Sequence, residues 1–260
     1  MRLNYSDINF HVEDGIGFIT LNRPEKRNAL SLNLMAEMID LCQGIKKNPE
    51  VRIVIIRAEG PVFSSGHDLS EMLGGNAVSY RSIFSACTEM MEAVRDLPQP
   101  VIAQVQGMAT AAGCQLVATC DLAVASEEAR FATPGVRIGL FCHTPQVPLS
   151  RAIGRKRALE MLFTGRAISA EEAERCGLVN RVVPAGRLAE ETLNLAKHIA
   201  QASPLTLALG KQSFYSQAAL EETQAYRYAQ EMMSLNAMSE DAQEGISAFL
   251  QKRPPKWKGR

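Results

Sequence analysis

The feature that most constrains the fold is a repeated alternation of short apolar runs with helical stretches. The runs 51–57 (VRIVIIR), 101–105 (VIAQV) and 121–126 (DLAVAS) are almost continuously apolar, which is typical of strands buried on both faces of a sheet. Helical periodicity separates them, most clearly over 31–47 and 78–97. Strands that alternate with helices predict βαβ units and a parallel sheet with right-handed crossovers. The predicted fold class is therefore α/β.

The two ends of the chain differ from this middle part. Near the start, residues 5–12 and 15–22 predict two strands joined by an Asp-Gly turn, which is a hairpin signal. Towards the end, residues 187–252 carry only helical periodicity. We therefore expect an α/β core over residues 1–186 and a helical region over residues 187–260.

Charge and cysteine usage exclude several classes of function. The chain has 260 residues, and its 28 Lys and Arg balance 28 Asp and Glu, so no net field attracts it to nucleic acid or to a membrane surface. No uncharged apolar run approaches the ~20 residues that a spanning helix needs. The six cysteines are scattered singly, without metal-ligand spacing, which indicates reduced thiols and no metal site. The N-terminal residues lack the features of a signal or transit peptide, so we expect a cytoplasmic protein.

Two segments that follow predicted strands carry the small residues expected of a ligand-binding loop. Residues 63–69 (FSSGHDL) follow the run 51–57, and residues 106–116 (QGMATAAGCQL) follow the run 101–105. At a helix entry such residues expose unpaired main-chain N–H groups, and two entries that converge form an anion or oxyanion site. A helix start rich in Gly and Ala can equally serve close packing alone, and composition does not decide between the two.

The order of several motifs resembles the enoyl-CoA hydratase/isomerase (crotonase) superfamily from about residue 6 to residue 255. The matching segments are LNRPEKRNAL (21–30), VFSSGHDL (62–69), 101–126, FATPGVRIGL (131–140) and 158–184. Within the superfamily, ATAAGCQL, FATPGV and GLFCHTP favour one particular branch. The resemblance implies a crotonase-type spiral of ββα units, a helical C-terminal trimerisation region, and a homotrimer or a homohexamer. It also implies an acyl-coenzyme A substrate, a place in fatty acid metabolism, and no cofactor beyond the coenzyme A that the substrate carries.

By position in those motifs, the resemblance implies that the main-chain N–H groups of His67 and Ala112 form an oxyanion hole for the thioester. Alanine is acceptable at position 112 provided that its φ stays negative. The residues that match coenzyme A or acyl contacts of the superfamily are Lys26, Ala29, Ser65, Gly66, Asp68, Leu69, Gly113, Pro134, Leu140 and Cys142. Asp68 also suits the cap of the following helix. The basic pair Lys252-Arg253 could reach the coenzyme's phosphates or form a solvated charge cluster.

Both catalytic carboxylates of a hydratase in this superfamily are replaced. Gln115 stands where the first glutamate is expected, and Gly135 stands where the second should follow Pro134. Glutamine has no proton to exchange near neutral pH, and glycine has no side chain. Because the loss of one acid–base group costs roughly 10²–10⁴-fold in rate, efficient hydration of enoyl-CoA is not expected. His143, beside Cys142, is the remaining candidate for proton transfer, with a surface imidazole and a packed thiol as the alternative.

Three functions therefore remain open at the level of sequence. The first is an enoyl-CoA hydratase/isomerase-like enzyme, of lyase or isomerase type, that stabilises a thioester enolate or oxyanion without efficient hydration. The second is a decarboxylase- or hydrolase-type acyl-CoA enzyme, since decarboxylation needs the oxyanion hole more than it needs a carboxylate base. The third is a non-catalytic acyl-CoA-binding scaffold. In each case the expected partners are an acyl-CoA thioester and further copies of the chain, with no nucleic acid and no membrane.

Overall fold

The computed structural model describes residues 5–260, so the first four residues of the predicted core region lie outside it. Its larger sheet contains, in spatial order, β1 (Ile8–Glu13), β2 (Ile16–Leu21), β3 (Ile53–Ala58), β5 (Val101–Val105), β7 (Leu122–Ser126) and β10 (Arg181–Val183). Its smaller sheet contains β4 (Val62–Ser64), β6 (Met108–Thr110), β8 (Arg130–Ala132) and β9 (Ile168–Ser169). Neighbouring strands are parallel except in the pairs β1–β2 and β8–β9.

Three consecutive units each place one strand in each sheet. β4 follows β3, β6 follows β5, and β8 follows β7. The helices after them are, in chain order, α2 (Ala77–Arg95), α3 (Ala112–Thr119), α4 (Gln146–Ile153) and α5 (Arg155–Thr164). This repetition confirms the α/β class and the spiral of ββα units. The strands β4 and β6 lie in segments predicted as loop and helix entry, because three residues are too few to show a period.

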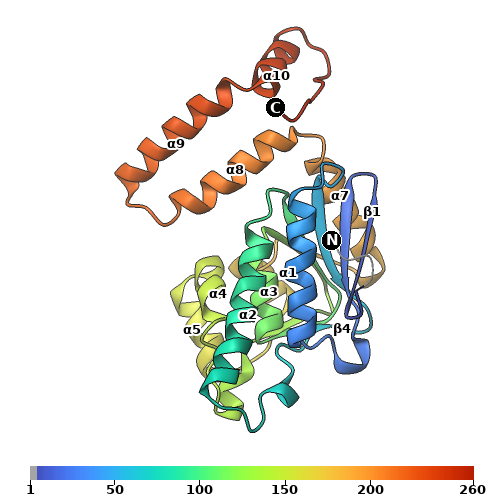
Figure 1. Cartoon of the computed structure of the whole chain (residues 1–260), viewed down its shortest axis with the longest axis vertical. Helices are drawn as coiled ribbons and strands as arrows, with labels where there is room; N and C mark the ends of the chain where they lie inside the picture. The colour runs from blue at the N-terminus through green and yellow to red at the C-terminus, as the bar shows by residue number, and fades with distance from the viewer. Residues whose placement is uncertain (1–4) are drawn as a thin grey trace.

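The larger sheet is buried on both faces, as its apolar runs predict. Along β3, Val54 and Ile56 pack with α1 (Leu32–Lys46), α2 and α3, whereas Ile53 and Ile55 pack with α7 (Leu188–Ile199). The α1–α3 layer is seen in front of the sheet in Figure 1. Thus α7 packs against the sheet although it falls within the predicted helical region 187–260, whose boundary stays a prediction.

Local signals in the sequence account for where elements turn and begin. The β1–β2 hairpin turns at Asp14 and Gly15, whose φ values of 49° and 80° match the type I′ turn favoured by Asp-Gly. The Ser31 hydroxyl accepts the Leu34 N–H at 3.1 Å and starts α1. Ser169 starts α6 (Ala170–Cys176) in the same way. Within residues 5–260 the 3₁₀ helices are η1 (Pro24–Lys26), η2 (Leu69–Glu71), η3 (Pro134–Ile138) and η4 (Ala185–Arg187).

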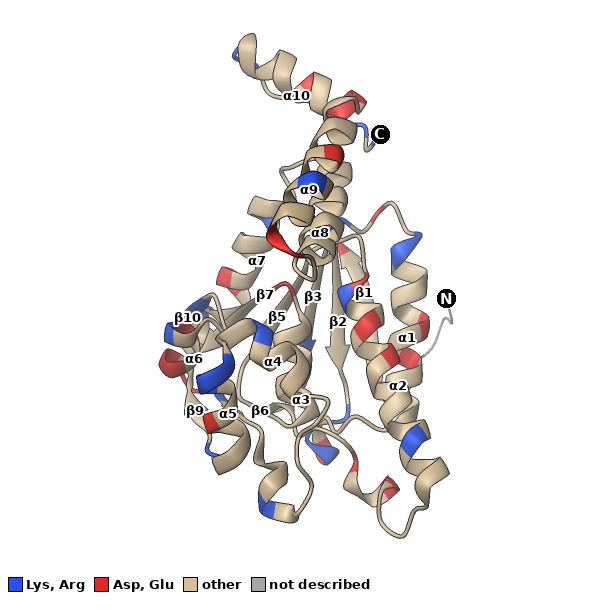
Figure 2. Cartoon of the chain, turned by 90° about the vertical axis from the view of Figure 1, so that its left-hand side faces the viewer, with Lys and Arg blue, Asp and Glu red and all other residues tan. Residues whose placement is uncertain are grey.

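Beyond α7 the chain leaves the sheet and forms an arm. The arm consists of α8 (Pro204–Gln217), α9 (Glu222–Ala237) and α10 (Glu240–Leu250). In Figure 1 and Figure 2, α9 and α10 project away from both sheets, whereas α8 is tied to the core by the ion pair between Lys211 and Asp121 at 2.7 Å. None of the described residues of α8 or α9 is buried, and Met233 and Met238 are both more than 70% exposed. Apolar residues exposed in this way support the predicted self-association, which stays a prediction.

Two carboxylates of α10 hold the last residues of the chain. Asp241 is 1% exposed and accepts hydrogen bonds from the Ser203 hydroxyl and from the main-chain N–H groups of Lys258 and Gly259, at 2.6, 2.6 and 3.0 Å. Glu244 forms a bidentate ion pair with Arg253 at 2.6 and 2.8 Å. Arg253 is therefore paired within the chain, which does not favour a contact between this side chain and the phosphates of coenzyme A.

The Asp241 contacts predict a dependence of stability on pH. Burial favours the neutral carboxyl, but the hydrogen bonds from Ser203 and from the two N–H groups outweigh it and hold the pKa of Asp241 below its usual range. A depressed pKa stabilises the folded chain above the unfolded pKa of about 3.9, and this contribution is lost as the pH falls through the folded pKa. Urea unfolding at pH 5 and pH 3 should therefore show a smaller loss of stability for Asp241→Asn than for the unaltered chain. Equal losses would contradict the assignment.

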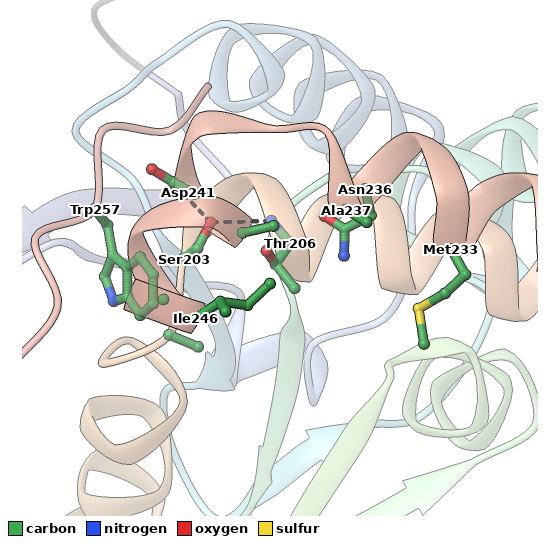
Figure 3. Close-up of a pocket in the computed structure, with 11 residues that line it drawn as sticks. Ser203, Thr206, Met233, Asn236, Ala237, Asp241, Ile246 and Trp257 are labelled. Carbon is green, nitrogen blue, oxygen red and sulfur yellow. Dashed lines mark hydrogen bonds between the residues drawn. The ribbon is translucent and has the colours of Figure 1, made fainter. Parts of the chain in front are cut away.

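A cavity of about 400 Å³ lies inside the arm (Figure 3). Side chains from the start of α8, from α9 and from α10 line it, among them Thr206, Asn236 and Ile246, and the Trp257 ring closes one side. The Ser203–Asp241 hydrogen bond crosses its wall. None of the residues that line the cavity belongs to the segments 63–69 and 106–116, so it is not the predicted thioester site.

Candidate active site

The loops after β4, β6 and β8 meet at one edge of the smaller sheet. These three strands are parallel neighbours, and Thr110 pairs with Ala132, so their carboxyl ends lie side by side. The loop after β4 touches the loop after β6: a Cβ placed on Gly66 would lie 2.9 Å from the Ala111 Cβ and 3.1 Å from the Ala112 nitrogen. The two segments predicted to supply the oxyanion hole are therefore adjacent in the fold.

The main-chain N–H of His67 is free to bind a ligand. Leu30 forms an isolated parallel bridge with His67. In that bridge the Leu30 N–H donates to the Gly66 oxygen at 2.8 Å, and the Asp68 N–H donates to the Leu30 oxygen at 3.3 Å. The N–H of the residue between them points to the opposite side in such a pairing. No hydrogen bond within residues 5–260 uses this N–H.

The second N–H belongs to Ala112, the first residue of α3, where helical N–H groups have no partner within the helix. Its φ is not positive, as the prediction requires; the strained residue is Ala111 before it, with φ 49° and ψ −118°. The Ala111 N–H donates to the Ala132 oxygen at 2.9 Å and fixes the turn from β6 into α3. This strained turn, which was not predicted, directly precedes the Ala112 N–H.

Asn28 holds the loop after β3 and was also missed from the sequence. It is fully buried with a φ of 51°. Its side-chain amide donates to the main-chain oxygens of Glu59 and Val62, both at 2.8 Å, and accepts the Arg23 N–H at 2.9 Å. The Ser64 hydroxyl donates to the Asn28 oxygen at 2.8 Å. Asn28 thus joins the segment that carries Leu30 to the strand that precedes His67.

The main-chain N–H groups of His67 and Ala112 together form the candidate thioester clamp. The His67 imidazole, on one of these two residues, makes no hydrogen bond to a described residue. Both ring nitrogens are buried and unpartnered among the described residues, and the ring packs edge-on against Phe84 at 5.5 Å between centroids. Burial lowers the pKa of His67, so the ring is neutral at pH 7. His143, in contrast, is exposed and packs against the Phe141 ring at 5.0 Å. This placement favours the surface alternative for His143 and leaves His67 as the better candidate for proton transfer.

Two buried side chains, in α3 and directly after β8, each carry an oxygen with no hydrogen-bond partner among the described residues. Gln115, one turn into α3, is 4% exposed, and its Oε1 accepts no hydrogen bond from a described residue. Thr133, directly after β8, is fully buried, and its hydroxyl is likewise unpartnered. Thr133 was not among the predicted site residues, because a threonine between a strand and a proline carries no recognisable signal. Buried polar groups of this kind are nearly always satisfied by a protein group, a water or a ligand.

At Gly135, where the superfamily's second glutamate is expected, neighbouring atoms of the chain leave no space for a side chain. A Cβ on Gly135 would lie 2.0 Å from the Leu140 oxygen and 2.9 Å from the Cys142 Sγ. The Leu140 N–H donates to the Gly135 oxygen at 3.0 Å, which closes this loop. Burial raises the pKa of the Cys142 thiol, so it stays protonated and is not an activated nucleophile.

The other residues predicted to contact coenzyme A or the acyl group have different surroundings and differ in exposure. Asp68 caps η2 by accepting the Ser70 N–H at 3.2 Å; hydrogen bonds from Ser70 and the nearby Arg23 hold its pKa below the usual range. Gly113 packs on the strand, since a Cβ there would lie 2.4 Å from the Ser64 oxygen. The exposed ones are Lys26, Leu69 and Leu140, the partly buried ones Ser65 and Pro134, and the buried one Ala29.

No group of three or more His, Cys, Asp or Glu residues within residues 5–260 could hold a metal ion. No helix among these residues is both long enough and apolar enough to cross a membrane. Acidic residues (red) and basic residues (blue) are interspersed over the ribbon in Figure 2.

Known proteins similar to this chain share its whole fold. The enoyl-CoA hydratase domain-containing protein 3 of Rattus norvegicus is 50% identical over 94% of this chain and 82% of its own length. The crystal structure of the human protein of that name is 48% identical, with a TM-score of 0.94 over 97% of this chain and 100% of its own. An enoyl-CoA hydratase from Mycobacterium smegmatis has a TM-score of 0.95 at 45% identity, over 97% and 99% of the two chains. These matches confirm the branch that the three short segments favour.

The expectation of a cytoplasmic protein is wrong. The relatives from rat, mouse, Xenopus laevis and human, each 50% identical to this chain, are all named mitochondrial. They point to a mitochondrial rather than a cytoplasmic protein. The expectation depended in part on scattered cysteines, which do not separate one thiol-reducing compartment from another.

A single family description spans the core, the candidate site and the arm. The model of the enoyl-CoA hydratase/isomerase family matches residues 11–260. The match therefore covers the loops after β4, β6 and β8 as well as the C-terminal helices. The chain belongs to the enoyl-CoA hydratase/isomerase family.

Proposed function

We propose that the chain is an acyl-coenzyme A enzyme whose His67 and Ala112 N–H groups stabilise a thioester enolate or oxyanion, and that it is not an efficient hydratase. The observation that carries the proposal is the adjacency of these two unpaired N–H groups at one sheet edge. A relative named 2,3-dehydroadipyl-CoA hydratase, from Escherichia coli and 33% identical over 93% of this chain, supports an acyl-CoA substrate.

The groups beside the clamp favour lyase or isomerase chemistry through an enolate. The neutral His67 ring can accept a proton from the carbon next to the thioester, and the two N–H groups then hold the negative oxygen that develops. Gln115 has no proton to exchange, and no side chain fits at Gly135. The protonated Cys142 thiol does not favour a thiolate hydrolase. A neutral His67 offers no positive charge to a substrate carboxylate, which does not favour a decarboxylase.

The clamp is tested by removing the atom that it holds. Butyryl-CoA should bind about tenfold more tightly than its thioether analogue butyl-CoA, because only the thioester offers a carbonyl oxygen to two N–H donors. Isothermal titration calorimetry on the full chain measures both dissociation constants. Coenzyme A itself is the control for the part that the two ligands share. Equal affinities for the thioester and the thioether would show that the clamp is not engaged.

Hydration is tested against a relative that keeps both glutamates. With crotonyl-CoA we expect kcat/KM to be lower by a factor of at least about 10⁴, since two acid–base groups that each contribute 10²–10⁴-fold are missing. The loss of the conjugated thioester's absorbance measures the rate. A comparable rate in the two proteins would overturn this part of the proposal. Exchange of the α-hydrogens of butyryl-CoA with deuterium, abolished in His67→Phe, would distinguish an enzyme from a binding scaffold.

A further inference from the structure

Arg23, two residues after β2, is a mostly buried cation to which the proposed reaction assigns no role. Its side chain is 16% exposed, and its guanidinium donates to the Ala29 main-chain oxygen at 2.7 Å. The same group forms ion pairs with Asp68 at 3.3 Å and with Asp7 at 3.5 Å. These contacts do not favour a role for Arg23 in binding the phosphates of coenzyme A. The shortest of them is the contact with the main chain.

The Ala29 oxygen leads through two peptide groups to the His67 N–H. In a trans peptide group the C=O and the N–H point in opposite directions, and the described residues include no cis peptide bond. The Ala29 oxygen and the Leu30 N–H belong to one such group, and the Leu30 N–H donates to the Gly66 oxygen at 2.8 Å. The Gly66 oxygen and the His67 N–H belong to the next. A relay of donors therefore runs from the Arg23 guanidinium through the peptide groups 29–30 and 66–67 to the clamp.

A hydrogen-bond chain of this kind strengthens its last donor. Each bond polarises the peptide group that follows it, and the strengthening is roughly 10–30% per bond. A charged donor at the start polarises the first group more than a neutral donor does, since hydrogen bonds from ionised groups are about twice as strong. Asp7 and Asp68 hold the guanidinium in place and offset part of its charge. The result at the far end is a His67 N–H that presents more positive charge to a ligand.

The second N–H of the clamp is polarised by a helix instead. The Ala112 N–H shares its peptide group with the Ala111 oxygen, which accepts the Gln115 N–H at 3.0 Å. That bond belongs to the first turn of α3, so the Ala112 N–H ends a chain of helical hydrogen bonds. No helix begins at His67, because η2 starts at Leu69. For the His67 N–H, a side-chain cation takes the place that the helix has for the Ala112 N–H.

Resting on the proposed function, we propose that Arg23 is a positioning residue of the clamp, which strengthens the His67 N–H through the peptide groups 29–30 and 66–67. A stronger donor draws more electron density onto the thioester oxygen, so it stabilises an enolate or oxyanion more than the neutral thioester. Arg23 itself touches neither the substrate nor the reacting atoms. Its effect therefore falls on the bound carbonyl group and not on the affinity for coenzyme A.

Infrared difference spectroscopy of butyryl-CoA, isotope-labelled at the carbonyl carbon and bound to the full chain, measures this polarisation. Binding should shift the carbonyl stretch to lower wavenumber. Arg23→Met, which lacks the donor and the charge, should lose about a third of the shift. Arg23→Lys should lose less, because its ammonium keeps the charge but ends one bond short of the terminal guanidinium nitrogens. By calorimetry, the preference for butyryl-CoA over butyl-CoA should fall from about tenfold to about threefold in Arg23→Met, while coenzyme A binds as before.

Two control variants separate the relay from a general loss of ion pairing. Asp7→Asn removes one carboxylate beside the guanidinium but leaves the contact with the Ala29 oxygen, so the shift should be kept or should grow. Arg166→Lys is matched for residue type, because Arg166 also joins two carboxylates, Glu160 at 3.5 Å and Glu172 at 3.1 Å. It lies outside the loops after β4 and β6 and should leave the shift unchanged. The thermal midpoint of each variant shows that the spectra are recorded on folded chains.

The outcomes separate this proposal from the function on which it rests. If the unaltered chain leaves the carbonyl stretch of bound butyryl-CoA unshifted, the clamp is not engaged and the proposed function fails. If the unaltered chain shifts the stretch and both Arg23 variants keep the full shift, the relay is overturned and the clamp is retained. Equal weakening of butyryl-CoA, butyl-CoA and coenzyme A also overturns the relay, since Arg23 then contacts the coenzyme or supports only the fold. Should Arg23→Met not fold, the shift in Arg23→Lys decides alone.

Discussion

Glutamate at position 135 should not restore hydration, and even alanine there should lower the free energy of unfolding by about 3 kcal/mol. The reason is the 2.0 Å approach of any Cβ to the Leu140 oxygen, a main-chain atom that cannot rotate away. The Cys142 Sγ, at 2.9 Å, crowds the same position. A double variant, Gln115→Glu with Gly135→Glu, is therefore expected to lose stability rather than gain activity, although Gln115→Glu alone fits by size.

Urea unfolding of Gly135→Ala measures this cost directly. The matched control is Gly186→Ala, because Gly186 is exposed and a Cβ there would meet nothing within 4 Å. The control should stay within about 0.5 kcal/mol of the unaltered chain. A Gly135→Ala chain of unaltered stability would mean that the loop through Leu140 moves freely. The double variant would then be a fair test of lost hydratase chemistry.

Substitution of Asn28 by alanine should cost about 3 kcal/mol of stability and weaken acyl-CoA binding. The change removes the three hydrogen bonds of the Asn28 side chain and leaves the main-chain groups of Arg23, Glu59 and Val62 without that partner. It also places alanine at a φ of 51°, which asparagine tolerates better. Binding should suffer because the segment around Asn28 carries Leu30, whose bridge leaves the His67 N–H free.

Asn28→Gly separates the two causes, since glycine accepts the positive φ but lacks the amide. Most of the stability loss should persist in Asn28→Gly if the hydrogen bonds dominate. Asn9→Ala, at an exposed position of β1, is the control for residue type and should change stability little. An Asn28→Gly chain as stable as the unaltered one would show that the amide hydrogen bonds contribute little.

The architecture could be predicted from the sequence because its main signals are long and repeated. The runs at β3, β5 and β7 are apolar on both faces, and the structure covers both faces with helices. The Asp-Gly turn and the Ser31 cap are local rules that tertiary contacts did not override. The resemblance to a known family added the ββα spiral, which periodicity alone would not have given.

The details of the site depend on contacts between distant segments, which no local pattern encodes. The importance of Asn28 comes from carbonyls more than 30 residues away. The strain at Ala111 and the orphaned hydroxyl of Thr133 arise only when β6 and β8 lie side by side. Gly135 reads as a missing acid in the sequence, but in the fold its space is taken by Leu140 and Cys142.

The use of main-chain N–H groups in the proposed clamp has a genetic consequence. A missense change at His67 to any residue except proline replaces the side chain but leaves the N–H in place, so the grip on the thioester tolerates many codons there, whereas Ala112 is fully buried and accepts only small residues. Gly66 has the opposite character: its φ of 88° and the Ala111 Cβ, 2.9 Å from any added Cβ, leave no room for another residue. Alleles that abolish thioester binding should therefore be found at this neighbouring glycine more often than at His67, which makes the contact.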